Sequence, residues 1–552
     1  MPPIKLFYIF LTALMASLLV MPSLYNLSIK VGGVDMPDYQ RKIHDRAVPR
    51  IGGIAILCGL LISVLLFCTT TTFISGLVTG GIIIFFVGFI DDLRSLTSVQ
   101  KLAGQIIGTS VGVIISQNHI KNLGDLFTLG TIELPTAFAI PFTIFCIVGL
   151  INSLNMIDGL DGLAGGVSAI ACLALAILAV EVGSQQVFFV SAALLGAVIG
   201  FLAHNAYPAR IFMGDAGSNL LGFTLGMLGV RLIDVSPTVS PVAILVILSV
   251  PVFDTLFVIA GRLISGRPVM RADRAHLHHR LLDIGLGHKA SVLAVFGWSY
   301  FMAAVAVLYY NASDSSLFLF VVIATAIFYL LLSLFAKYFP KGKDKIDDDT
   351  MLLVTAWNSA IERLGDKLLL IARYLAVIIL AIALPIELAP DPYHAAASAI
   401  LLCVLLLGVA CNRAWINQLL LIGLYLTGAY LLFEAEIHGR TATIGDVPVL
   451  AYSAYLFALL ALIIGIKVFI RKRYNVLMDS AIEFSVLLAV IFIPLMPDQL
   501  TAPYHLLTVA GKSIILFVAY KLFLISNDVR RNRMVILSSI LALFVNLINR
   551  VI

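Results

Sequence analysis

The chain has 552 residues, of which 61% are hydrophobic and 12% are charged, and its formal net charge is +5. With a mean hydropathy of +1.04, this composition excludes a soluble globular domain, and repeated apolar runs of near membrane-spanning length indicate an all-α polytopic membrane protein. The modest net charge gives no reason to expect a nucleic-acid partner.

Eleven apolar runs follow one another in the first 340 residues. We expect membrane-spanning helices near residues 4–20, 51–71, 73–90, 102–116, 137–151, 163–181, 187–204, 216–233, 239–261, 291–311 and 316–337. The first run lacks a convincing small-residue cleavage site and many further runs follow it, so we interpret it as a retained helix rather than a secretory signal.

Basic residues follow the odd-numbered runs. Arg41 and Lys42 follow the first run, Arg94 the third, Arg210 the seventh and Arg280 the ninth. Because cytoplasmic loops of membrane proteins are enriched in Lys and Arg, this pattern predicts an N-terminus outside and these loops in the cytoplasm. For a bacterial protein, the predicted location is the inner (cytoplasmic) membrane.

A second region begins after Pro340. A charged connector at 341–349 is followed by residues 351–364, which include Trp357 and are predicted to form an interfacial helix. About seven additional transmembrane helices are expected near 368–388, 395–411, 416–434, 449–470, 479–496, 506–525 and 534–549. We therefore divide the chain into a membrane domain at 1–340, a connector with the interfacial helix at 341–366, and an accessory transmembrane module of unknown role at 367–552.

Asp91 and Asp92 end the third run, in the string VGFIDDLRSLTSVQKL. They could be boundary residues that cap the next helix. They could instead be a like-charge pair that binds a cation or shares a proton, with Arg94 or Lys101 holding a phosphate nearby. The string alone leaves both interpretations open.

The string NSLNMIDGLDGLAGG occupies residues 152–166, directly after the fifth run. Carboxylates and amides are costly in a bilayer, so such a cluster between apolar spans indicates a functional site. Asn155, Asp158 and Asp161 are three residues apart, so a helical turn would place them roughly on one face. Hard oxygen ligands beside glycines are what a Mg²⁺-bound phosphate compound needs.

Two further carboxylates follow later runs. Asp215 lies in FMGDAGS, where it could cap a helix, bind a metal ion, or do both. Asp254 lies in the apolar run PVFDTLFVIAGR, where it could pair with Arg262 or belong to the site. With the inferred topology, all of these residues except Asp254 fall at the cytoplasmic face.

A histidine-rich string, DRAHLHHRL, follows the ninth run. HLHH permits transition-metal binding, but the surrounding arginines favour contact with phosphates. No CxxC pair occurs among the six cysteines, so neither a zinc site nor a disulfide framework is indicated. A charged turn after the first run, DMPDYQRKIHDRAVPRIGG, would by itself be ordinary positive-inside sequence.

Together, five strings resemble the motifs of the polyprenyl-phosphate N-acetylhexosamine-1-phosphate transferases. In chain order they are DMPDYQRKIHDRAVPRIGG, GFIDDLRS, NSLNMIDGLDGLAGG, FMGDAGS and DRAHLHHRL. The resemblance covers roughly residues 1–340 and implies an eleven-helix transferase core, dependence on Mg²⁺ (or Mn²⁺) and a cytoplasmic active site. Leu277 separates two histidines that are consecutive in the peptidoglycan branch, so the chain is more similar to the bacterial branch that uses UDP-N-acetylglucosamine.

The resemblance implies transfer of a sugar 1-phosphate, with GlcNAc-1-phosphate first in order, from a UDP-sugar to undecaprenyl phosphate. UMP is released, and the product begins an O-antigen, common-antigen or teichoic-acid type of chain. The implied partners are the UDP-sugar, undecaprenyl phosphate and membrane lipids, and a homodimer is left open. The extension beyond Pro340 is not needed by this family and leaves open a second activity.

The resemblance also implies roles for individual residues. Asp215 and Asn155 would contact the metal ion, and four carboxylates would be catalytic: Asp91, Asp92, Asp158 and Asp161. Of these, Asp91 and Asp92 would orient or deprotonate the lipid phosphate. Residues that would bind substrate phosphate or nucleotide are Lys42, His44, Lys101, Asn152, His276, His278, His279 and Arg280.

Two alternatives remain at this point. The same chemistry could use a UDP-linked N-acetyl-6-deoxyhexosamine. A protein of a different class, an ion-coupled transporter, could use membrane carboxylates as a relay, although a transporter would tend to place them near the middle of the bilayer.

Overall fold

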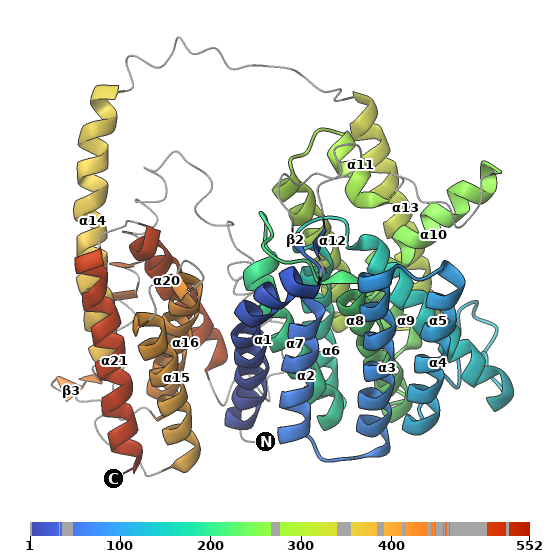
Figure 1. Cartoon of the computed structure of the whole chain (residues 1–552), viewed down its shortest axis with the longest axis horizontal. Helices are drawn as coiled ribbons and strands as arrows, with labels where there is room; N and C mark the ends of the chain where they lie inside the picture. The colour runs from blue at the N-terminus through green and yellow to red at the C-terminus, as the bar shows by residue number, and fades with distance from the viewer. Residues whose placement is uncertain are drawn as a thin grey trace. The chain divides into compact units, whose positions relative to one another are not determined.

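The computed structural model describes residues 3–31, 34–35, 48–266, 276–338, 355–382, 391–410, 416–438, 443–444, 447–448, 456–457, 459–460, 463, 505–525 and 529–551. The chain forms two compact units, Met1–Gly342 (unit 1) and Lys343–Ile552 (unit 2). Each unit is a bundle of helices, labelled as in Figure 1.

Unit 1 contains thirteen helices among the described residues. They are α1 (Pro3–Val31), α2 (Gly53–Phe67), α3 (Thr72–Arg94), α4 (Ser98–Ser116), α5 (Thr136–Ile157), α6 (Leu163–Glu181), α7 (Gln185–Asn205), α8 (Gly214–Val235), α9 (Pro241–Ile247), α10 (Ser249–Ile264), α11 (Leu277–Asp283), α12 (His288–Leu308) and α13 (Asp314–Tyr338). A two-residue antiparallel pair, β1 (Val34–Asp35) and β2 (Val48–Pro49), lies between α1 and α2.

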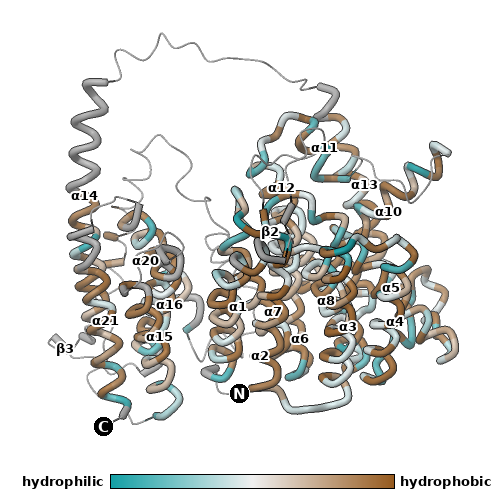
Figure 2. The backbone as a smooth tube through the Cα atoms, in the orientation of Figure 1, coloured by the Kyte–Doolittle hydropathy of each residue, from teal (hydrophilic) through white to brown (hydrophobic). Residues whose placement is uncertain are grey.

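Nine helices in the described part of the chain are long and apolar enough to cross a membrane, and all nine belong to unit 1. Figure 2 shows hydrophobic residues along the lengths of these helices and more hydrophilic residues towards their ends and loops. The predicted all-α polytopic class is therefore confirmed. Each of the eleven predicted runs corresponds to a helix or a helix pair of unit 1, with α2 shorter than a usual span at 15 residues.

The predicted continuous span at 239–261 is wrong. Here α9 and α10 meet at an angle of 81°. Pro251 lies in the first turn of α10 and has no N–H to donate to a preceding carbonyl, so the helical hydrogen-bond ladder is interrupted at this point. Mean hydropathy contains no information about direction, and the residues around the break are as apolar as those of a straight span.

Helix α8 lies in the interior of unit 1, and its first turn fixes the geometry of the polar end of the bundle. The backbone N–H groups of Gly52 and Gly53 donate to the carbonyl oxygens of Phe212 and Met213, both at 2.9 Å. These bonds tie the segment before α2 to the segment before α8. As a result, α8 begins beside the ends of α3, α5 and α7.

Unit 2 contains five helices and a second two-residue strand pair among the described residues. They are α14 (Thr355–Ile382), α15 (Pro392–Ala410), α16 (Ile416–His438), β3 (Thr443–Ile444), β4 (Val447–Pro448), α20 (Leu506–Ile525) and α21 (Val529–Val551). The predicted spans at 449–470 and 479–496 lie largely outside the described residues. The predicted interfacial helix at 351–364 is, from Thr355 onwards, continuous with α14.

Candidate active site

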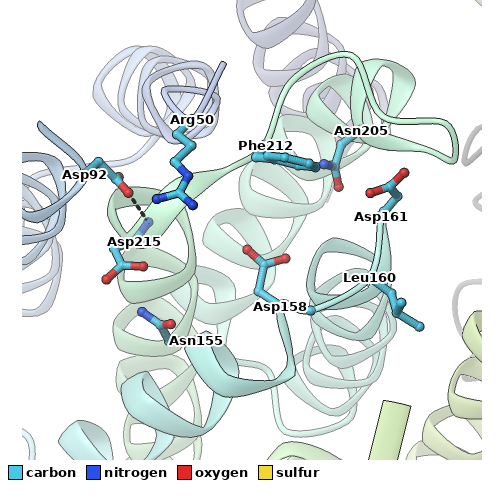
Figure 3. A pocket seen from close by; sticks show the side chains of 11 residues that line it. Arg50, Asp92, Asn155, Asp158, Leu160, Asp161, Asn205, Phe212 and Asp215 are labelled. Carbon is cyan, nitrogen blue, oxygen red and sulfur yellow. Dashed lines mark hydrogen bonds between the residues drawn. The ribbon is translucent and has the colours of Figure 1, made fainter. Parts of the chain in front are cut away.

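A polar cavity of about 230 Å³ lies where α3, α5 and α7 end and α8 begins. The side chains around it come from loops and helix ends that are far apart in the sequence (Figure 3). The lining residues are Arg50, Asp92, Asn155, Asp158, Gly159, Leu160, Asp161, Asn205, Phe212, Gly214 and Asp215. Five of the predicted site residues are therefore brought together: Asp92, Asn155, Asp158, Asp161 and Asp215.

Asp92 caps the N-terminus of α8. Its two carboxylate oxygens accept hydrogen bonds from the backbone N–H groups of Asp215 at 2.8 Å and Ala216 at 3.0 Å. A carboxylate here satisfies orphan donors of the first turn and interacts favourably with the positive end of the helix dipole. Asp92 is therefore a cap, as one of the two interpretations required, but it caps a helix distant in the sequence rather than the next one.

Gly214 allows this approach. Its φ is +69°, which disfavours other residues, and an added Cβ would lie 2.4 Å from Oδ2 of Asp92. The same Cβ would lie 2.2 Å from the carbonyl oxygen of Arg50. Gly214, the first glycine of FMGDAGS, is thus needed to bring the Asp92 carboxylate onto the first turn of α8.

Lys101 lies between two carboxylates. Its ammonium group is 3.2 Å from Oδ2 of Asp91 and forms a close ion pair with Asp215. Asp91 also accepts the backbone N–H of Leu96 at 2.6 Å, just after α3 ends. Lys101 was predicted to bind a phosphate; in this structure its charge is paired with two acidic side chains, and contact with a phosphate stays a prediction.

Asn155 lines the cavity, whereas Asn152, one turn earlier on α5, does not. The Nδ2 group of Asn152 donates to Oε1 of Gln105 and to the carbonyl oxygen of Val148, both at 2.8 Å. The amide of Asn152 thus forms a hydrogen bond that links α5 to α4. The predicted role of Asn152 in nucleotide binding stays a prediction, and these contacts do not support it.

Asp158 follows directly after α5 and faces other carboxylates across the cavity. Although its side chain is not completely shielded from solvent, burial raises the pKa of the Asp158 carboxyl to about 8, and the negative charge of Asp215 adds to the shift. The cavity therefore has an excess of negative charge that favours protonation of Asp158 or entry of a cation.

Asp161 and Asn205 connect the two loops that flank the cavity. Asp161, which is 6% exposed, accepts the backbone N–H of Ala209 at 2.9 Å. Asn205 accepts the N–H of Gly162 at 2.9 Å and donates to the carbonyl oxygen of Ile211 at 2.8 Å. Part of the hydrogen-bonding capacity of Asp161 is therefore structural, although its side chain still borders the cavity.

Arg50 supplies a positive charge to the cavity lining. The sequence analysis did not single it out as a site residue. It precedes α2, and Figure 3 shows its guanidinium group among Asp92, Asp158 and Asp215. In the sequence it is one of several basic residues in a loop predicted to be cytoplasmic, so positive-inside composition explained it fully. A planar, permanently charged fork at this position suits a phosphate ligand.

The histidine string is fixed by Asp254. Oδ2 of this buried aspartate is 2.9 Å from Nδ1 of His276, and its Oδ1 accepts the N–H of Leu277 at 2.8 Å and the hydroxyl of Tyr329 at 2.9 Å. Asp254 thus positions the start of α11. Arg280 lies over the ring of Phe257, with 4.7 Å between the guanidinium carbon and the ring centroid.

His278 is 2% exposed and packs against Gly159 of the cavity. Burial, together with a smaller effect of the neighbouring His279, lowers the pKa of His278 to about 3, so its imidazole is neutral at physiological pH. In this arrangement His278 offers no positive charge to a phosphate. His276, His278, His279 and Arg280 are absent from the described cavity lining, and their predicted phosphate contacts stay predictions.

Gly159 provides a test of this contact. An added Cβ would lie only 2.1 Å from Nε2 of His278, whereas a Cβ at Gly149 on α5 would have no neighbour within 4 Å. We expect Gly159→Ala to destabilise the protein by about 1–3 kcal/mol through overpacking, and Gly149→Ala to leave stability unchanged or slightly higher. Thermal unfolding of both variants in the same detergent checks this, and equal unfolding temperatures would contradict the packing described.

Two predicted residues, Lys42 and His44, lie outside the described residues, as do Arg267, Arg271 and Arg274, three of the arginines around the histidine-rich string.

The residues present fit a Mg²⁺ ion that is held by a few protein ligands together with phosphates and water. The described part of the chain contains no group of three His, Cys, Asp or Glu side chains placed to hold a metal ion by themselves. Mg²⁺ usually binds through one or two carboxylates together with phosphates and water. Asp215 and the amide oxygen of Asn155, open to the same cavity, match that limited donor set.

Fold and site together define a multi-pass membrane protein with an acidic, arginine-containing cavity at one end of a helical bundle. The model of glycosyl transferase family 4 matches residues 74–233. This segment contains Asp92, Asn155 and Asp215.

Curated relatives agree with this match. The chain is 34% identical over 299 residues to a probable undecaprenyl-phosphate N-acetylglucosaminyl 1-phosphate transferase of Bacillus subtilis, covering 53% of this chain and 82% of that protein. It is 34% identical over 349 residues to a decaprenyl-phosphate N-acetylglucosaminephosphotransferase of Mycolicibacterium smegmatis, with coverage of 56% and 84%. An undecaprenyl-phosphate alpha-N-acetylglucosaminyl 1-phosphate transferase of Salmonella typhi is 27% identical, with coverage of 49% and 74%.

The chain therefore belongs to the polyprenyl-phosphate N-acetylglucosamine-1-phosphate transferase family, as the motifs predicted. The transporter alternative is not favoured, because the relatives are transferases and the acidic residues gather at helix ends rather than along a span.

Proposed function

We propose that unit 1 transfers GlcNAc-1-phosphate from UDP-GlcNAc to undecaprenyl phosphate and releases UMP. The observation that carries the proposal is the cavity where Asp92, Asp158, Asp161 and Asp215 meet Arg50 at the end of an apolar bundle. A lipid phosphate reaches such a place from the membrane, and a nucleotide sugar reaches it from water.

In this reaction an oxygen of the lipid phosphate attacks the phosphorus that carries the sugar. The bond from that phosphorus to the oxygen bridging the two phosphates breaks, and UMP leaves with the electron pair. The product is a polyprenyl-diphosphate sugar. Because anions must meet, positioning and neutralisation of charge supply most of the catalysis.

The residues of the cavity divide these tasks. Arg50 is placed to neutralise a phosphate, and Asp92 holds the first turn of α8 so that Asp215 faces the cavity. A phosphate monoester has a second pKa near 6 and is mostly dianionic at neutral pH, so it needs little help from a base. Asp92 therefore serves mainly by positioning Asp215.

A Mg²⁺ ion, for which Mn²⁺ could substitute, would be held by Asp215 and Asn155 and would neutralise charge on the diphosphate of the nucleotide sugar. The negative charge around Asp158 supports a cation at this site. The sugar is proposed on the names of the relatives, and a UDP-linked N-acetyl-6-deoxyhexosamine is the competing substrate. The basic loops after odd-numbered spans support a cytoplasmic cavity in the inner membrane.

An assay with full-length protein tests the proposal. Membranes containing the protein receive UDP-[³H]GlcNAc, undecaprenyl phosphate and Mg²⁺, and UMP and organic-soluble label are measured. We expect equal amounts of UMP and lipid-linked sugar, and loss of both with a chelator. Membranes without the protein are the control.

Absence of both products would contradict the proposed activity. Comparing UDP-GlcNAc with UDP-linked N-acetylfucosamine and N-acetylquinovosamine identifies the sugar. Faster turnover of either deoxy sugar would contradict the assignment of GlcNAc and leave the reaction type intact.

A further inference from the structure

A chain of buried amide side chains links α4, α5 and α8 directly beneath the cavity. Oδ1 of Asn219, on the second turn of α8, lies 3.4 Å from Nε2 of Gln105 and 3.4 Å from Nδ2 of Asn155. Gln105 in turn accepts from Asn152 at 2.8 Å. Asn219 and Gln105 are both 0% exposed.

This arrangement fixes which way the amide of Asn155 faces. One oxygen of Asn219 receives the NH₂ groups of two neighbours, so the NH₂ of Asn155 is directed towards α8. The carbonyl oxygen of Asn155 is then left for the cavity, where the side chain lies near Asp215 and Asp158 (Figure 3). An amide oxygen directed into the cavity is a cation ligand, whereas an NH₂ group would repel a cation.

Part of the Asn219 side chain is unfavourable for stability. Its own Nδ2 is buried and has no hydrogen-bond partner, which is unfavourable inside a helical bundle that crosses a membrane. A leucine of similar shape would remove that disadvantage, but it would leave the NH₂ groups of Gln105 and Asn155 without this acceptor. What asparagine supplies at this position, and leucine does not, is an oxygen that directs these two NH₂ groups.

We propose that Asn219 is a positioning residue, which holds the carbonyl oxygen of Asn155 towards the cavity and so sets the affinity of the site for a divalent cation. The expected effect of Asn219 on turnover rests on the proposed function. Its effect on cation binding is a separate property of the protein. Residues that orient a metal ligand typically contribute about 10- to 100-fold to affinity or activity.

The test is Asn219→Leu in the full-length protein. Binding of Mn²⁺ is measured by electron paramagnetic resonance in the absence of substrate, beside the Mg²⁺ dependence of UMP release and the temperature of unfolding. We expect Mn²⁺ affinity to fall about tenfold or more, a parallel rise in the Mg²⁺ concentration needed for half-maximal turnover, and an unfolding temperature that is unchanged or modestly lower, because Gln105 and Asn155 lose their acceptor.

Thr109→Val is the matched control, because Thr109 lies one turn from Gln105 on α4, is 0% exposed and has no hydrogen-bond partner for its hydroxyl. It should leave all three properties unchanged. If Asn219→Leu fails to fold, Asn219→Ala removes the same acceptor without added bulk. Normal Mn²⁺ affinity in a folded Asn219 variant would overturn the inference, whereas inactive wild-type protein that binds Mn²⁺ would overturn only the proposed function.

Discussion

Asp215→Asn is expected to lower turnover by about 100-fold or more, since it removes the charge of a ligand to the cation. Among the described residues, the change also leaves Asp91 as the one charged partner of the Lys101 ammonium group. UMP release at a series of Mg²⁺ concentrations measures the effect, and the half-maximal Mg²⁺ concentration should rise together with the loss of turnover.

Asp234→Asn is the matched control, because Asp234 lies near the other end of α8 and pairs with Lys121 at 2.5 Å. Its turnover should stay within about twofold of wild type, because the change lies away from the site. An Asp215→Asn enzyme with the wild-type Mg²⁺ dependence would show that Asp215 does not bind the metal ion.

Asp92→Asn should also lower turnover by about 100-fold, because an asparagine can accept only one of the two N–H groups that Asp92 accepts and has no charge to place at the helix terminus. The loss comes from displacement of Asp215. The residual activity should therefore require more Mg²⁺ than that of the wild-type enzyme.

A general base predicts a different response to Mg²⁺ for Asp92. Asp92→Asn would then lower turnover while the Mg²⁺ dependence stayed the same. Measuring turnover of both enzymes at several Mg²⁺ concentrations separates the two roles. An unchanged Mg²⁺ dependence in Asp92→Asn would contradict the capping role.

Hydropathy was sufficient to predict the helical bundle, because the long helices of unit 1 must bury or embed an apolar surface. The break between α9 and α10 escaped prediction since Pro251 stands in a run whose composition fits a straight span. Lys42 and His44 lie outside the described residues, so their predicted roles are untested.

Within the site, clustered polar residues were easier to recognise than single ones. Asp158 and Asp161 stood out because two carboxylates and two amides occur together between apolar runs. Arg50 was hidden by neighbouring basic residues. Gln105 and Asn219 were overlooked although each is an amide within an apolar stretch of helix, a signal that could have identified both.

The ion pair with Lys101 gives the Asp215 carboxylate a counter-ion of its own. A metal ion that binds Asp215 must compete with this ammonium group for the same carboxylate. Once displaced, the ammonium group is available to an incoming phosphate. Cation entry and phosphate capture would then be two halves of one exchange, and departure of the products would return Lys101 to Asp215, so the site would never hold its carboxylates without a positive partner.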